Sequence, residues 1–174
     1  MINTNNQNNT KESILYNNIL LLSRNELFYT KFDLSDTFQN RIHLIFIHIS
    51  FIFVKTKIDM KDKEYKTFYQ KLFDFLLKQI ELNMREVGYG DVSVNKYMKA
   101  LIKSFYNILL YCENYKNEKQ ESKNIFFSRY LKTNITQKMA NNEPLIEYFD
   151  KFQVFCFDLS ADKVLKGDLN FKNN

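Results

Sequence analysis

The chain has 174 residues, with 25 lysines and arginines against 20 aspartates and glutamates, and only two cysteines, Cys112 and Cys156, far apart in the sequence. A chain of this length can bury a core without metals or disulfides, and the cysteine spacing argues against a zinc site and a disulfide framework. We expect reduced, buried thiols. The net charge of +5 is too mild to identify a nucleic-acid-binding protein, and no DNA binding is expected.

Helical periodicity begins after a polar, Asn-rich start, and residues 1–12 are predicted to be disordered. Residues 13–22 place apolar side chains at helical spacing, and a shorter helical piece over residues 24–32 completes a small hairpin. Residues 36–57 follow, with an almost entirely apolar middle at residues 42–54. That stretch is too short to cross a bilayer, so we predict the central core helix, although its isoleucine and phenylalanine content also permits a strand.

Two long amphipathic helices are predicted over residues 62–87 and 93–115, where apolar residues recur every three or four positions. The turn between them contains two of the three glycines. Gly88 stands where the first helix should end, because glycine adopts the left-handed C-terminal conformation without steric cost. Asp91 or Ser93 is expected to N-cap the second helix. The stretch therefore predicts a tight helix-to-helix corner.

The charges of this corner mostly suit their positions. Arg85 lies in a last helical turn, where the helix dipole favours a cation, and Asp91 lies where the next helix favours an anion. Glu86 is disfavoured in a last turn, so we expect a cationic neighbour such as Arg85, Lys96 or Lys99. Turn chemistry alone favours a purely structural interpretation of these residues.

The C-terminal part is predicted to contain a loop over residues 114–123, a weaker helix over residues 123–138 and a last helix over residues 144–157. The only proline opens this last helix, since the first helical position needs no N–H. No repeat or linker divides the chain. The predicted fold is an all-α, single-domain bundle of about six helices over residues 13–160, with a C-terminal turn and tail over residues 161–174.

No pattern of catalytic residues is recognisable. His43 and His48 would lie about 140° apart around a helix, so one metal ion cannot easily bind both, and core histidines are expected. Asp150, Asp158 and Asp162 are close in sequence but lack clustered partners. Phosphate-binding and nucleophile motifs are missing from the sequence. We therefore predict a protein that is not an enzyme and that needs no metal and no cofactor.

A basic helix face keeps a binding function open. Lys96, Lys99 and Lys103 share the polar side of the second long helix, where they could contact phosphate, although such lysines most often serve solubility. A basic ribosome- or RNA-binding helical module is therefore one hypothesis.

Short motifs spread along the chain add a family resemblance. The central ones are Arg85, Glu86, Gly88, Gly90, Asp91, Ser93, Val94 and Lys96. The others are Leu15 and Tyr16, Ser23 and Arg24, Phe28 and Tyr29, Asp36 and Thr37, Arg41, His48, Leu72 to Asp74, Phe105 and Tyr106, Leu165, Gly167 and Phe171. With these motifs the chain resembles the ubiquinol–cytochrome c chaperone family, well over residues 15–114 and thinly beyond.

The resemblance implies a helical, non-catalytic chaperone that binds a client, newly made cytochrome b, and promotes assembly of ubiquinol–cytochrome c reductase (bc1, complex III). In mitochondrial relatives it further implies a ribosome and a small helical partner subunit. The residues that we expect to bind client or partner are Asp36, Arg41, Arg85, Glu86, Asp91, Lys96 and Lys99, and those of the structural corner are Gly88, Gly90 and Ser93. Without a recognisable secretory signal, we expect a protein of the bacterial cytoplasm, peripheral at the inner membrane, or on the matrix side of a mitochondrion.

Overall fold

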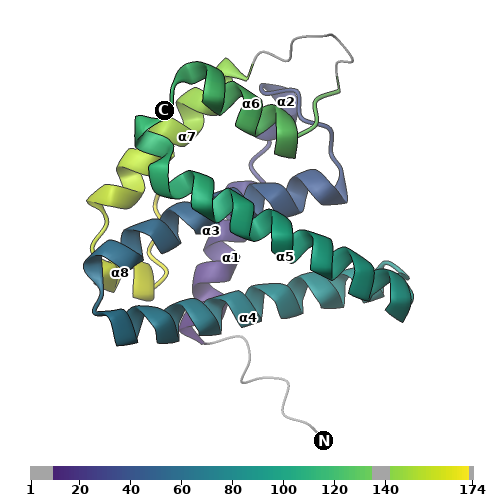
Figure 1. Cartoon of the computed structure of the whole chain (residues 1–174), viewed down its shortest axis with the longest axis horizontal. Helices are drawn as coiled ribbons and strands as arrows, with labels where there is room; N and C mark the ends of the chain where they lie inside the picture. Colours follow the sequence, from purple (N-terminus) through teal and green to yellow (C-terminus); the bar gives the residue numbers. More distant parts are fainter. Residues whose placement is uncertain (1–9, 135–141, 173–174) are drawn as a thin grey trace, which may run out of the picture.

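A computed structural model describes residues 10–134 and 142–172 of the chain. Its elements are all helical: α1 (Lys11–Ser23), α2 (Leu27–Thr30), α3 (Phe38–Asp59), α4 (Asp62–Glu86), α5 (Asp91–Asn114), the 3-10 turn η2 (Tyr115–Asn117), α6 (Gln120–Tyr130), α7 (Glu143–Asp158) and α8 (Ala161–Leu165) (Figure 1). Across these residues the only β-type pairing is an isolated bridge between Leu34 and Thr133. The predicted all-α, single-domain fold is confirmed.

Helix α3 forms the centre of the molecule and packs against α1, α4, α5, α7 and α8. Thr37 starts it, because its hydroxyl accepts a hydrogen bond from the Asn40 N–H at 3.2 Å. From Ile42 to Val54 every residue is buried, and a helix that is apolar on all sides needs neighbours on all sides. The prediction of a central core helix is therefore confirmed, and the strand alternative is wrong.

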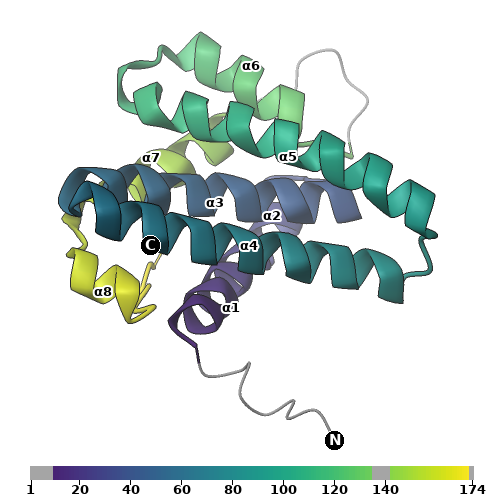
Figure 2. The same cartoon turned by 60° about the horizontal axis from the view of Figure 1, so that its bottom comes forward.

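The other helices surround α3 in layers. Figure 2 shows α5 and α6 above the layer formed by α3 and α4, with α1 and α8 below it. Helices α4 and α5 run side by side from the corner that joins them, and both contact α3. This arrangement places the α4–α5 corner (residues 87–90) at one end of the molecule (Figures 1 and 2).

Several predicted boundaries differ from the structure. The first long helix was predicted to continue to Val87, but α4 ends at Glu86, and Val87 lies in the corner with 71% of its surface exposed. The predicted loop over residues 114–123 contains η2 and the start of α6, and α6 already ends at Tyr130 because Leu131 is extended. The last part of the helix predicted over residues 123–138 lies outside the described residues.

The two histidines and two cysteines belong to the core, as predicted. His43 donates through Nδ1 to the Tyr130 carbonyl oxygen at 2.6 Å, and its burial lowers the pKa of the imidazole. Cys112 and Cys156 are free thiols whose pKa values are raised by burial.

The C-terminal segment, residues 166–172, packs back on the bundle. Leu169 is buried, and the Phe171 ring lies 5.2 Å from that of Phe152. Asn18 of α1 donates to the Gly167 carbonyl oxygen, so this segment ties α1 to α8. At the other end of the chain, residues 1–12 were predicted to be disordered, and residues 1–9 of that segment lie outside the described residues. Helix α1 begins at Lys11, so the last two residues of the segment are helical.

In the part of the chain that the structure describes, no helix combines the length and apolar character that a membrane crossing requires.

Candidate functional site

The α4–α5 corner has the geometry that its sequence predicts. Gly88 has a φ of +99°, its N–H donates to the Arg85 carbonyl oxygen at 3.0 Å, and the Tyr89 N–H donates to that of Met84 at 3.1 Å. These two bonds form a Schellman motif, which satisfies the last carbonyls of α4. The glycine at position 88 is therefore explained by local backbone chemistry.

The predicted N-cap of α5 is wrong. Gly90 occupies the N-cap and offers no side chain, while Asp91 is the first residue of the helix and Ser93 lies exposed in its first turn. Asp91 still benefits from the helix dipole, but its carboxylate accepts a hydrogen bond from Arg85 instead of capping the helix. The short turn between the helices brings Arg85 beside Asp91 and places Gly90 at the N-cap position.

The corner charges form a small network on the surface. Arg85 bridges Asp91 and Glu81, the latter at 2.9 Å, and the hydrogen bonds to Asp91 and then Glu81 raise the pKa of the guanidinium. Glu86 makes no ion pair with any described residue, so the expected cationic neighbour is wrong. Arg85 instead pairs with Glu81 and Asp91, which leaves Glu86 without a salt-bridge partner among the described residues.

A groove of about 210 Å³ lies between α1, α3 and α4, just before the corner. We call it the α1–α3–α4 groove. It is lined by Tyr16, Leu20, Ser23 and Arg24 of α1, by Phe38, Arg41, Ile42 and Ile45 of α3, and by Ile80, Asn83, Glu86 and Val87 of α4 and its end.

The groove has an apolar floor and a mixed rim. Ile42, Ile45 and Ile80 are almost fully buried and form the floor, whereas Phe38 and Val87 keep 37% and 71% of their surface exposed. Exposed apolar side chains occur elsewhere on the molecule as well, but here they adjoin an apolar floor. The site thus offers a contact for apolar side chains at the edge of the core.

Arg41 is held in place at this rim. Its guanidinium donates two hydrogen bonds to the Asp36 carboxylate, at 2.6 and 2.8 Å, and this contact lowers the pKa of Asp36. The pair is exposed and adds little to stability, but its bidentate geometry orients both side chains.

The segment before α3 is anchored by a residue that the sequence did not single out. Asn40 is fully buried, donates to the carbonyl oxygens of Ser35 and Lys132 at 2.7 Å each, and accepts from the Lys132 N–H at 2.9 Å. It therefore joins the segment that carries Asp36 to the end of α6. The sequence did not identify Asn40, because the chain contains many asparagines and because Asn40 meets Lys132 only in the folded protein.

The predicted site residues therefore fall into three groups. Arg41 and Glu86 line one groove, with Asp36 holding Arg41, while Arg85 and Asp91 form the neighbouring corner. Lys96 and Lys99 are exposed on α5, outside the groove lining. Arg24, Phe38 and Val87 are groove residues that the site prediction missed, although Arg24 belonged to a motif of the family resemblance.

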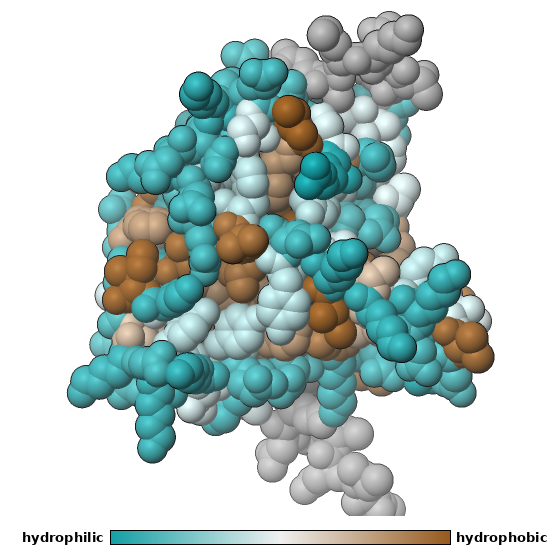
Figure 3. All heavy atoms as spheres, viewed as in Figure 1, coloured by the Kyte–Doolittle hydropathy of each residue, from teal (hydrophilic) through white to brown (hydrophobic). Residues whose placement is uncertain are grey.

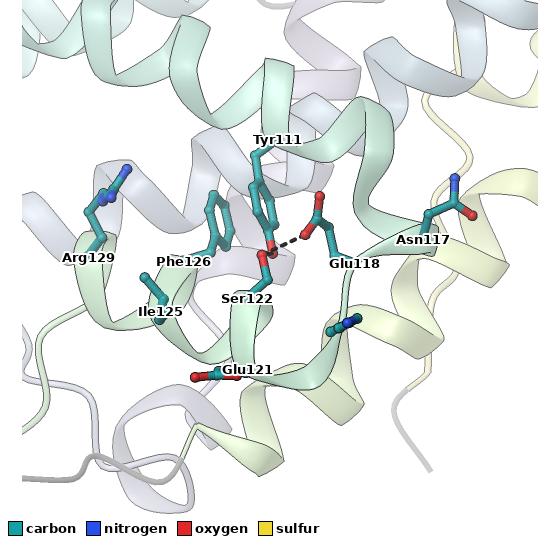
Figure 4. Close-up of a pocket in the computed structure, with 9 residues that line it drawn as sticks. Tyr111, Asn117, Glu118, Glu121, Ser122, Ile125, Phe126 and Arg129 are labelled. Atoms are coloured by element: carbon teal, nitrogen blue, oxygen red, sulfur yellow. Dashed lines mark hydrogen bonds between the residues drawn. The ribbon is translucent and has the colours of Figure 1, made fainter.

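A second groove, the α5–α6 groove, lies on another side of the molecule. Figure 4 shows Tyr111 and Phe126 stacked at its floor, with ring centroids 4.0 Å apart, and Ser122 donating to Glu118 at 2.6 Å. Its volume is about 520 Å³, and both acidic and basic side chains line it, namely Glu118, Glu121, Lys119 and Arg129.

On the face of the molecule seen in Figure 3, hydrophobic residues form separate patches among hydrophilic ones.

A metal site is not indicated: residues 10–134 and 142–172 contain no group of three histidine, cysteine, aspartate or glutamate side chains placed to hold a metal ion. Asp150, one of three aspartates close in sequence, pairs with Lys123 at 2.7 Å.

Two comparisons with known proteins found a match. A family model described as ubiquinol-cytochrome C chaperone matches residues 30–171. Among solved structures, the chain is similar to a Cbp3 homolog from Brucella abortus, with a TM-score of 0.77 and 21% sequence identity over 94% of this chain and 89% of that chain. At this identity, the structural likeness shows a shared fold. No curated protein matches the chain.

Proposed function

The chain belongs to the ubiquinol–cytochrome c chaperone family, and we propose that it is a non-catalytic assembly chaperone that binds newly made cytochrome b and promotes assembly of the bc1 complex. The observation that carries the proposal beyond the family is the α1–α3–α4 groove, where an apolar floor meets exposed Phe38 and Val87. A new membrane protein exposes apolar segments that must be shielded from water before assembly, and such a groove offers that shielding.

The size of the groove fits a client segment better than a small-molecule substrate. Ligand pockets for small molecules usually enclose about 300–1,000 Å³, whereas this groove encloses about 210 Å³. That volume suits one or two anchoring side chains of a longer chain, with the rest of the client lying across the surface.

The remaining contacts are part of the same proposal. We propose Asp36, Arg41 and Glu86 as client contacts at the groove, and the corner with Arg85 and Asp91 as the adjacent surface. Lys96 and Lys99 on α5 are proposed contacts for a ribosome, a small helical partner subunit or the membrane surface. The protein would then work peripherally, at the cytoplasmic face of a bacterial inner membrane or on the matrix side in a mitochondrion.

The alternative, a basic ribosome- or RNA-binding module without a client, gains no support from the grooves. The α5–α6 groove combines aromatic side chains with equal numbers of acidic and basic ones in its lining, and a binding site for a polyanion needs an excess of cations.

Gene deletion combined with matched variants tests the proposal. Deletion should lower bc1 activity and membrane haem b, and the wild-type chain should restore both. The double variant Phe38→Asn with Val87→Asn removes the exposed apolar rim, so it should lose about tenfold or more of its capture of cytochrome b in pull-downs from detergent-solubilised membranes.

A control with the same residue types lies on another helix. Phe157 and Val154 of α7 have 37% and 61% of their surface exposed, and these fractions are similar to those of Phe38 and Val87. Neither residue lines the groove. The double variant Phe157→Asn with Val154→Asn should capture cytochrome b normally. If bc1 activity and haem b survive deletion unchanged, the chaperone function is wrong; if both double variants behave alike, the client binds elsewhere.

A further inference from the structure

The rim of the α1–α3–α4 groove carries two charges of opposite sign that the protein itself leaves uncompensated. Arg24 caps the end of α1 and Glu86 ends α4, and neither forms an ion pair with a described residue. The third rim charge, Arg41, is already neutralised by Asp36. The groove therefore presents one free cation and one free anion to whatever binds there.

These two charges lie on different walls, with the apolar floor of Ile42, Ile45 and Ile80 in the same groove. When a partner covers such a floor, it removes water from the rim as well. A charge in a partly dehydrated rim attracts an opposite charge more strongly than it would on open surface, because the effective dielectric constant is lower. A partner that leaves either charge unpaired loses affinity for the same reason.

We propose, on the basis of the chaperone function proposed above, that the groove selects an apolar helical segment that carries an acidic residue against Arg24 and a basic residue against Glu86. The apolar side chains of the segment, spaced three or four positions apart, enter the groove. The two charges fix how the segment lies across it. The ligand class is thus a peptide with an apolar stripe bounded by opposite charges.

The same two charges disfavour other occupants. An anionic lipid or an RNA would meet Arg24 favourably, but Glu86 in the same lining would repel its next phosphate. A segment with basic residues at both ends would pair with Glu86, but Arg24 would repel its other basic residue. Only a segment with both signs satisfies both walls.

Binding of synthetic helical peptides to the full chain, measured by fluorescence anisotropy, tests this selection. The peptides share one leucine–alanine helix and differ at the flanks: one aspartate and one lysine, two aspartates, or two lysines. The mixed peptide should bind the wild-type chain about tenfold more tightly than either of the others, at low salt, and the difference should shrink as salt rises.

Charge exchange in the protein makes the test specific to these residues. Arg24→Glu should shift the preference to the two-lysine peptide, and Glu86→Lys should shift it to the two-aspartate peptide. The double variant, with both exchanges, should again prefer the mixed peptide. A control exchange, Arg129→Glu with Glu121→Lys in the α5–α6 groove, should leave the wild-type preference unchanged.

Arg24 and Glu86 are both exposed, so their variants should unfold at nearly the same temperature as the wild type. Equal binding of all three peptides, no binding of any, or a preference that ignores the exchanges would overturn the inference. The proposed function would survive this result if deletion still lowers bc1 activity and the wild-type chain still captures cytochrome b, so the two failures are distinguishable.

Discussion

His48 illustrates how a single residue is determined by its surroundings. Its Nδ1–H donates to the Leu44 carbonyl oxygen at 2.7 Å, so Nε2 is left to accept the Tyr148 hydroxyl at 2.9 Å. The rings of Phe149 and Phe152 lie 5.0 and 4.7 Å away. Full burial lowers the pKa of this imidazole to about 4, which keeps it neutral. The sequence predicted a core histidine, but it gave no sign of Tyr148 as the partner.

This histidine should make the fold sensitive to acid. The pKa is 6.5 for the free side chain and about 4 in the folded protein, so the unfolded chain binds more protons between these values. Stability should be complete above about pH 6.5 and should fall by about 3 kcal/mol towards pH 4. Urea unfolding between pH 4 and pH 6.5 measures this change in the free energy of unfolding. In His48→Gln, stability should be lower at neutral pH and much of this pH dependence should disappear; an unchanged pH dependence would exclude His48 as its source.

At the scale of elements, the α4–α5 corner was largely predictable, because the signal is local. Gly88 was identified from its place between two amphipathic patterns, and its positive φ confirms the prediction. Glu86 was predicted to have a cationic neighbour such as Arg85, Lys96 or Lys99, because the helix dipole disfavours a carboxylate in the last turn. The structure instead pairs Arg85 with Glu81 and Asp91, because one turn of α4 and the corner bring these carboxylates to it.

The two corner glycines should respond differently to substitution. Gly88 has a left-handed backbone conformation, and a Cβ there would meet no atom within 4 Å, so Gly88→Ala should cost about 1 kcal/mol from backbone strain alone. Gly90 has an ordinary φ of −72° at the N-cap, so alanine brings no backbone strain there. Alanine is a poorer N-cap residue than glycine, but it also restricts the unfolded chain, so the net cost of Gly90→Ala should be only a few tenths of a kcal/mol. Chemical denaturation of both variants compares them, and equal losses would contradict the assignment of strain to Gly88.

For the whole molecule, the C-terminal segment completes the bundle by holding α1, which supplies one wall of the α1–α3–α4 groove. Gly167 has a φ of +72° and lies against α1: a Cβ at this position would come within 2.7 Å of Ile14 Cγ2 and 3.2 Å of the Leu15 nitrogen. The close approach leaves no room for a side chain. Both the left-handed backbone conformation and the close contact with α1 therefore favour glycine at position 167.

Gly167→Ala should consequently cost more than Gly88→Ala, about 2 kcal/mol or more, because steric overlap with α1 adds to the backbone strain. Hydrogen exchange should also speed up along α1, since the substitution loosens the contact that ties this helix to α8. Lys166→Ala, at an exposed neighbouring position, should change neither quantity. A Gly167→Ala variant as stable as Gly88→Ala, with native exchange in α1, would show that the two segments adjust without cost.

The amino-acid sequence was sufficient for features that depend on neighbours within a few residues. The apolar run from Ile42 to Val54, the helix stop at Gly88 and the helix start near Pro144 all follow from periodicity and backbone preferences, which are local. The α1–α3–α4 groove was beyond such reasoning, as was the exposure of Val87. A groove between three helices depends on how their faces meet, and that is decided by close packing among residues far apart in the chain.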